Sequence, residues 1–356
     1  MQAPQLLRDE LNDKLRQIIE RQRSDRPVKI APERALAETL GVSRLSLRAA
    51  IGDLVDEGLL VRKQGSGTFI VPNVKLDSLD LYLAPGIKPK DPFYQDFVST
   101  FSRSLGRRSI SVRLIDGHAA DGRAGDARAA DGRAAGVVRS DNPLVIVGLA
   151  PQEQILRLKE CYRHIVSVQS YPDTLDIGQI FFDDYMIGRH AGQILREYGH
   201  RKVVHIAGPQ KYPSAAERLR GFSDAADGEL SARIIHGKMN WSSGYALGDE
   251  VFDLVRGDFG ASAVFTVNDW LALGLIRRLA ERGVTVPDEL SMIGCDDIHL
   301  ATEIEPKLAT FKWDIEFLVG ELLHMLESTM SNESYPHKRV MLPAQFVKRD
   351  SLKEVG

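Results

Sequence analysis

Over residues 79–350, short apolar runs alternate with amphipathic helical patterns, and this alternation restricts the possible folds more than any other feature. The runs "PLVIVGLA" at 143–150, "KVVHIAG" at 202–208 and "ASAVFTV" at 261–267 are almost wholly apolar. Strands without a polar face are buried on both sides, which is typical of parallel sheets covered by helices. We therefore predict an α/β fold here, with enough chain, about 280 residues, for two such lobes.

Residues 1–72 have a different pattern. Apolar residues between Leu7 and Ile19 recur at spacings of three and four, which predicts an amphipathic helix. Gly41 is a candidate helix stop, and Ser43 is a candidate cap for the helix after it. The order of elements, with two β runs after the third helix, predicts a winged helix-turn-helix. The elements after the first helix are helices at 33–41 and 44–58 and β runs at 59–62 and 67–71.

The stretch "VRKQGSGTFIV" at 61–71 has two interpretations. Its glycines beside Lys and Arg could cradle a nucleotide phosphate, or they could form the tip of a hairpin that touches a nucleic-acid backbone. A phosphate loop leads from a strand into a helix, whereas these glycines lie between two strands. The wing is therefore favoured. Charge alone would not indicate it, because residues 1–72 hold 12 Lys and Arg against 10 Asp and Glu.

The segment "APERALAETLGVSRLSLRAAIGDLVDEGLLVRKQGSGTFIV" closely resembles the DNA-binding domain of the GntR family of bacterial regulators. The resemblance implies that the Arg of "PER", the start of the third helix and the wing contact DNA. Leu45 departs from the family, which usually has a polar residue there. The DNA-binding residues so implied are Arg34, Ser43, Arg44, Leu45, Ser46, Arg48, Lys63, Gln64, Gly65 and Ser66.

Polar residues gather where the predicted strands of the larger region end. "IFFDD" ends in Asp183 and Asp184, "FTVND" in Asn268 and Asp269, and "SMIGCDD" in an aspartate pair. The carboxyl ends of parallel strands are where such folds bind ligands. Carboxylates, amides and Arg grip hydroxyl groups, and aromatic faces stack on C–H surfaces, so we expect a site for a sugar-like molecule.

This region resembles the effector domain of the LacI/GalR family, which is itself similar to periplasmic sugar-binding proteins. The matching motifs include "DDYMIGRHAGQILREYGHRKVVHIAGP", "ERLRGF" and "VFTVNDWLALGLIRRLAERGVTVPDELSMIGCDD". Trp313 replaces a usual glutamine, and Trp241 lies two residues after the usual aromatic position, which is Met239 here. The effector-binding residues implied by the resemblance are Phe93, Tyr94, Asp183, Arg218, Trp241, Asn268, Asp296 and Trp313.

The predicted organisation is a winged helix at 1–72, a polar linker at 73–78 and a two-lobed, periplasmic-binding-protein-like, Rossmann-like sensor domain at 79–356. The segment 116–135 repeats "ADGRA" and lacks large apolar residues, so we expect an irregular or weakly helical surface segment there. Its aspartates do not follow the spacing of a calcium-binding loop.

Several classes of protein are disfavoured. No apolar run is long enough to cross a membrane, and the N-terminus lacks the pattern of a secretory signal. Two cysteines without a Cys/His cluster suit a cytoplasmic protein with no metal site. No motif pairs a nucleophile with a base, so we expect no enzyme and no cofactor.

The best interpretation is a cytoplasmic, homodimeric repressor that binds operator DNA and a sugar effector. Fusions of this kind resemble the arabinose-responsive repressors of some bacteria. A non-sugar effector, co-repression and activation remain open alternatives. A solute-binding receptor and an enzyme fused to a GntR-type domain are less favoured.

Overall fold

The computed structural model describes residues 3–24, 27–63, 66–72, 76–87, 90–116, 140–226, 228–331 and 339–355. Gln64 and Gly65 of the predicted wing lie outside these ranges, as do residues 117–135 of the repetitive segment and 73–75 of the predicted linker. The chain divides into two compact units, Met1–Asp77 with Leu323–His337, and Ser78–Leu322 with Lys338–Gly356.

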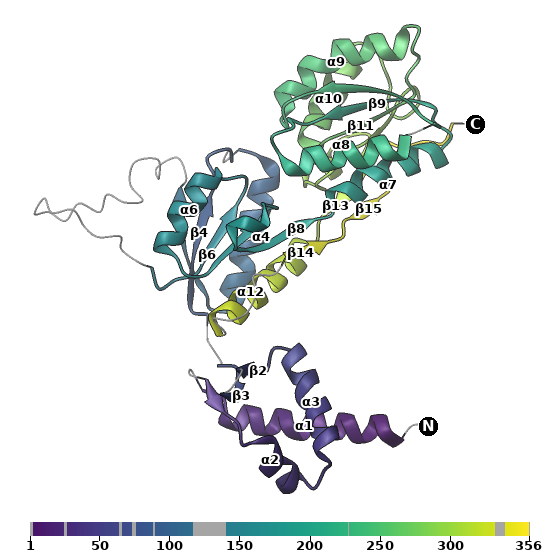
Figure 1. Cartoon of the computed structure of the whole chain (residues 1–356). Coiled ribbons are helices and arrows are strands. Elements are labelled where there is room, and N and C mark those ends of the chain that lie inside the picture. The colour runs from purple at the N-terminus through teal and green to yellow at the C-terminus, as the bar shows by residue number, and fades with distance from the viewer. Residues whose placement is uncertain are drawn as a thin grey trace, which may run out of the picture. The chain divides into compact units, whose positions relative to one another are not determined.

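The first unit is a winged helix-turn-helix, as the sequence predicts (Figure 1). Its three strands form an antiparallel sheet in the order β1-β3-β2, in which β2 and β3 are the hairpin. Leu11 and Leu15 are buried together with Leu47, Ile51 and Leu54. The elements are α1 (Ala3–Gln22), β1 (Val28–Lys29), α2 (Glu33–Leu40), α3 (Arg44–Asp56), β2 (Leu60–Lys63) and β3 (Gly67–Ile70).

The turn between α2 and α3 is set by two local signals. Gly41 ends α2 in the left-handed conformation, with a φ of 66°, which glycine adopts without steric cost. The amide of Val42 then donates to the Ala37 carbonyl at 3.1 Å. Ser43 caps α3 by accepting a hydrogen bond from the Ser46 amide at 3.0 Å.

The second unit contains two parallel sheets, which confirms the predicted α/β class. The first lobe is built on a six-stranded sheet in the order β14-β8-β7-β6-β4-β5. Its elements are β4 (Ser78–Leu83), α4 (Pro92–Arg107), β5 (Ser111–Asp116), β6 (Leu144–Val147), α6 (Gln152–Cys161), β7 (Ile165–Val168), the 3-10 helix η1 (Asp173–Leu175), β8 (Gly178–Phe182) and β14 (Arg339–Leu342).

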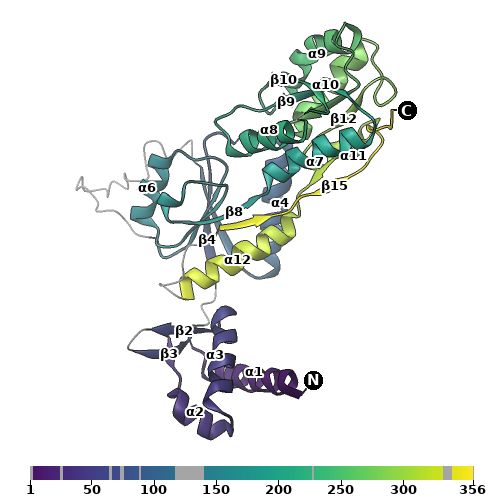
Figure 2. The same cartoon turned by 45° about the vertical axis from the view of Figure 1, so that its right-hand side comes forward.

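The second lobe is built on a four-stranded sheet in the order β10-β9-β11-β12. Helices α7 and α8 cover one face of this sheet and α9 and α10 cover the other (Figures 1 and 2). Its elements are α7 (Asp184–Glu197), β9 (Lys202–Ala207), α8 (Pro213–Ala226), β10 (Ser231–His236), α9 (Trp241–Arg256), β11 (Ala263–Thr266), α10 (Asp269–Glu281), β12 (Ser291–Ile293), α11 (Leu300–Glu303), β13 (Thr310–Lys312) and β15 (Gln345–Val347).

The chain passes between the two lobes three times. It leaves the six-stranded sheet after β8, returns to it from β13 through α12 (Ile315–Ser331) and β14, and leaves again to pair β15 with β13. The first two crossings fall at Asp183 and Trp313, which are both predicted site residues. Of the helices in the described ranges, none is long and apolar enough to span a membrane.

Candidate ligand-binding cleft and nucleic-acid interface

A cavity of about 90 Å³ in the second unit is lined by residues of both lobes. The carboxyl ends of β6, β7 and β8 contribute from the first lobe, and those of β11 and β12 from the second. Polar and aromatic side chains dominate the lining. They include Asp91, Phe93, Tyr94, Gln169, Phe182, Asp184, Tyr212, Ser214, Arg218, Met239, Asn268, Asp296 and Trp313.

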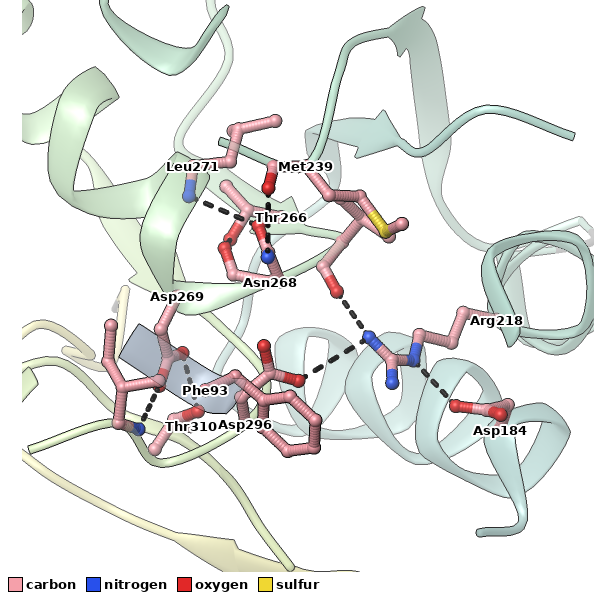
Figure 3. Close-up of polar contacts among 12 residues, drawn as sticks. Phe93, Asp184, Arg218, Met239, Thr266, Asn268, Asp269, Leu271, Asp296 and Thr310 are labelled. Atoms are coloured by element: carbon pink, nitrogen blue, oxygen red, sulfur yellow. Dashed lines mark hydrogen bonds and ion pairs between the residues drawn. The ribbon is translucent and has the colours of Figure 1, made fainter. Parts of the chain in front are cut away.

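Arg218 is the central charged group of this cleft, and only 3% of its surface is exposed. Its Nε donates to Asp184 Oδ1 at 2.8 Å, and its Nη1 donates to the Val267 carbonyl and lies 3.9 Å from Asp296 Oδ1. Figure 3 shows the guanidinium between the two carboxylates. Burial alone would lower the pKa of Arg218, but the carboxyl groups of Asp184 and Asp296 beside it contribute to raising it overall. The guanidinium therefore stays charged.

Helix packing places Arg218 beside Asp184. A Cβ atom on Gly188 of α7 would lie 1.9 Å from the Arg218 carbonyl oxygen. A Cβ atom on Gly221 of α8 would lie 1.9 Å from the Tyr185 carbonyl oxygen. Only glycine allows the two backbones this approach, so the α7–α8 crossing depends on both positions.

The carboxyl group of Asp296 is buried in the cleft on an unusual backbone. Asp296 has a φ of 119° and Asp297 a φ of 55°. Residues other than glycine rarely adopt positive φ values of this kind. The loop is held because the Asp296 amide donates to the Phe311 carbonyl at 2.9 Å and Arg349 pairs with Asp297. Burial raises the pKa of Asp296 well above its usual value, and Arg218 opposes the shift. Strained backbone of this kind is concentrated at functional sites.

Aromatic rings line the cleft around the crossing at Trp313. The indole ring lies 4.8 Å from the ring of Phe93 and 4.2 Å from that of Phe182, centroid to centroid, and 5.5 Å from the Arg218 guanidinium carbon. The Trp313 Nε1 is buried without a hydrogen-bond partner among the described residues. An unsatisfied buried donor costs stability, and this one belongs to a residue that lines the cavity.

The structure separates the predicted aspartate pair at the first crossing. Asp183 caps α7 by accepting from the Met186 amide at 3.0 Å, and it does not line the cleft. Asp184 lines it and pairs with Arg218. Asn268 lines the cleft and also caps α10, accepting from the Leu271 amide at 3.1 Å. The resemblance implied Asp183 as the effector contact, whereas Asp184 is the member of the pair that lines the cleft.

Trp241 lies away from the cleft, and Met239 is the residue of that segment that lines it. Trp241 borders a separate open groove together with Trp270. Phe93, Tyr94, Arg218, Asp296 and Trp313 are all brought together in the cleft. Gln169, Tyr212 and Ser214 also line it, and no motif singled them out.

Asp269 is buried behind the cleft. It accepts hydrogen bonds from the Thr310 hydroxyl at 2.7 Å and the Ile298 amide at 3.1 Å, as Figure 3 shows in part. Burial raises the pKa of Asp269 to about 7. Its partners connect α10 with β13 and with the loop that carries Asp296, so it is a positioning residue. Within the described ranges, no group of His, Cys, Asp or Glu is arranged to hold a metal ion.

In the first unit, the predicted DNA-contacting residues of α2 and α3 are exposed. Arg44, Ser46 and Arg48 are exposed on the first turns of α3, and Leu45 is 81% exposed. Arg34 lies 3.3 Å from Glu38, an exposed pair with little net energy. On the wing, Ser66 is exposed and Lys63 ends β2, opposite Gly67.

Two family models match the chain. Residues 7–70 match the model described as bacterial regulatory proteins of the gntR family, and residues 193–352 match that of a periplasmic binding protein-like domain. The chain joins a GntR-type helix-turn-helix domain to a periplasmic-binding-protein-like domain. The GntR match lies within the first unit, and the other match lies in the second unit except for residues 323–337.

Relatives of the chain include a transcriptional regulator and a catabolite control protein. The HTH-type transcriptional regulator CelR of Thermobifida fusca is 29% identical over 179 residues, which are 49% of this chain and 52% of CelR. Catabolite control protein A of Priestia megaterium is 26% identical over 218 residues, which are 60% of this chain and 65% of that protein. The chain thus spans about half to two thirds of the length of these relatives.

Solved structures share the fold. A LacI family transcriptional regulator from Enterococcus faecium with bound ribose superposes with a TM-score of 0.63 and 23% identity, over 78% of this chain and 100% of that one. The CelR–cellobiose complex gives a TM-score of 0.64 and 21% identity, over 90% of this chain and 100% of that one. At these identities the likeness establishes the fold of the periplasmic-binding-protein-like domain.

Proposed function

We propose that the protein is a cytoplasmic transcriptional regulator whose GntR-type domain binds operator DNA and whose interlobe cleft binds a small uncharged sugar. The observation that carries the proposal is the buried cluster of Arg218, Asp184 and Asp296 beside aromatic rings, in a chain that also has a winged helix. The regulators CelR and catabolite control protein A, and the carbohydrates named with related structures, support it.

The charges of the cleft favour an uncharged ligand. Arg218 is the one Lys or Arg among the residues that line the cleft, and it is already paired with Asp184 and close to Asp296. Asp91 adds a third carboxyl group to the lining. An acidic sugar or sugar phosphate would bring a negative charge into this set without a free cation, which is unfavourable at low dielectric. Hydroxyl groups, by contrast, can donate to the carboxylates.

The ligand class is tested by thermal shift with pentoses, hexoses, sugar acids and sugar phosphates. A neutral monosaccharide should raise the unfolding midpoint, because a ligand that binds the folded state stabilises it by mass action. Asp296→Asn should remove the shift, and Asp258→Asn, at an exposed position outside the cleft lining, should retain it. A shift produced only by the acidic compounds would contradict the proposal.

The proposed mechanism is repression relieved by the effector, with coupling between the two domains. The effector should change operator affinity by roughly 5- to 150-fold, and operator DNA should change effector affinity by the same factor. Titrations in both directions measure this. Arg44→Ala should abolish sequence-specific operator binding while effector affinity stays unchanged. An effector that strengthens operator binding would indicate co-repression instead, and operator occupancy that increases transcription would indicate activation.

A homodimer is part of the proposal. Strand β5 lies at the edge of the six-stranded sheet and exposes Val112 and Leu114, which are 37% and 59% accessible. Exposed apolar edge strands favour pairing with a second chain. Two copies would also present two recognition helices to a pseudo-palindromic operator.

We also propose that the chain has no catalytic activity. The residues that line the cleft include no His, Cys or Lys, so the lining offers no imidazole base, thiol nucleophile or Schiff-base amine. Incubation with the bound sugar should return it chemically unchanged.

A further inference from the structure

Leu45 is the most exposed large apolar side chain in the described part of the chain, at 81% accessibility. It is the second residue of α3, and its neighbours Arg44, Ser46 and Arg48 are also exposed. The buried face of α3 is formed by Leu47, Ala50, Ile51 and Leu54, so the fold does not need an apolar residue at position 45.

The exposed face of α3 has two stripes. Arg44 and Arg48 are four residues apart and form a basic stripe, and Leu45 and Ala49, also four apart and exposed, form an apolar stripe beside it. A four-residue step rises about 6 Å along a helix, which corresponds to roughly two base pairs of DNA. Two neighbouring stripes of this kind therefore fit adjacent bases in one groove.

The chemistry of the two stripes differs in what it can recognise. A guanidinium donates to the O6 and N7 of guanine, whereas an aliphatic side chain can neither donate nor accept. In the major groove, the one apolar group on a base edge is the 5-methyl group of thymine. A sugar contact would be the alternative for Leu45, and it carries no base preference.

We propose that Leu45 is a specificity-determining residue that reads the methyl group of a thymine in the operator half-site, next to a guanine contacted by the basic stripe. This inference depends on the proposed function, because it requires that the GntR-type domain binds DNA in a sequence-specific way. It goes further by assigning one base and one chemical group to one residue.

The experiment begins with enrichment of a random duplex library by the full-length protein without effector. The enriched half-site is then synthesised with deoxyuridine in place of each thymidine in turn, which removes only the methyl group. One substitution should weaken binding about four-fold, the value expected for one buried methyl group. The Leu45→Ala variant should bind the thymidine and deoxyuridine duplexes equally at that position.

Two controls separate recognition from folding. The unfolding midpoint of Leu45→Ala should match that of the wild type, because the side chain is exposed. Leu45→Gln should enrich adenine in place of thymine at the same position, because a glutamine amide pairs with the N6 and N7 of adenine.

The outcomes are distinguishable. If every deoxyuridine substitution is tolerated, or if Leu45→Ala remains as sensitive as the wild type, Leu45 does not read a methyl group, and the DNA-binding function stands. If no sequence is enriched at all, the proposed function itself is wrong, and the inference fails with it.

Discussion

At the scale of single residues, the cleft is defined by groups whose polar atoms are buried but incompletely paired. Trp313 has a buried Nε1 without a partner among the described residues, and Asp296 is a carboxyl whose side chain is only 8% exposed, on strained backbone. Such groups cost stability in the unliganded protein. We infer that they are retained because a ligand pairs with them, and this makes single substitutions informative.

Replacing Trp313 with Phe should weaken effector binding with little change in the stability of the free protein. The Phe ring keeps most of the stacking surface and loses the N–H donor. Loss of one hydrogen bond, about 1 kcal/mol, predicts roughly five-fold weaker binding by calorimetry. Trp270→Phe, outside the cleft lining, is the matched control and should bind normally. Equal affinity of the two variants would show that the indole N–H makes no contact with the ligand.

Asp269 predicts a pH dependence of stability with a definite sign. Its pKa is raised from 3.8 to about 7, so between those values the folded protein holds a proton that the unfolded chain releases. The free energy of unfolding should therefore fall as pH rises from about 4 to about 7, by at most about 1.4 kcal/mol per pH unit. Asp269→Asn should flatten this part of the profile in denaturant titrations. The quantity to measure is the difference between the stability profiles of the wild type and Asp269→Asn, because the pKa values of Asp184 and Asp296 are also raised.

At the scale of elements, the site depends on how closely α7 and α8 cross. Asp184 begins α7 and Arg218 lies in α8, and the two meet because glycines at 188 and 221 let the helix backbones approach. The ion pair is thus a consequence of packing between two helices that are separated in sequence by β9.

Gly188→Ala should disturb both stability and binding. The added Cβ would meet the Arg218 carbonyl oxygen at 1.9 Å, so α8 must move and carry the guanidinium away from Asp184. Overpacking of this kind costs about 2–3 kcal/mol in the free energy of unfolding, and effector affinity should fall as well. Gly106→Ala in α4 is the control, because nothing lies within 4 Å of its added Cβ. A neutral Gly188→Ala would mean that the helices tolerate a wider crossing.

At the scale of the whole molecule, the proposed function requires a dimer, in which each chain supplies one recognition helix and one cleft. In the first unit, one face of α3 exposes basic and apolar side chains. In the second unit, the cleft holds a buried charge cluster in which Arg218 is already paired with Asp184. Neither unit explains regulation alone. We therefore expect oligomerisation through the second unit to govern operator binding by the first.

Leu114→Lys should convert the protein to a monomer. A lysine on the exposed edge strand β5 should oppose pairing of this edge with a second chain. Sedimentation should show the loss of the dimer, and operator affinity should fall because two half-sites are no longer bound together. Leu156→Lys, at an exposed apolar position on α6 that is 53% accessible, is the control and should stay dimeric. A dimeric Leu114→Lys protein would place the interface elsewhere.

The winged helix, the two parallel lobes and the strand ends where the cleft forms could all be predicted from the sequence. These follow from local signals: Gly41 and Ser43 set one turn, and apolar strands between amphipathic helices set the sheets. The sequence did not predict α12, β13, β14 or β15, because these elements depend on where the chain crosses between lobes. It was the packing of the folded chain that placed Asp184 in the cleft lining in place of Asp183, and Met239 in place of Trp241. Adjacent residues at a strand end point in different directions, and the direction taken is fixed by helix packing that no short motif records.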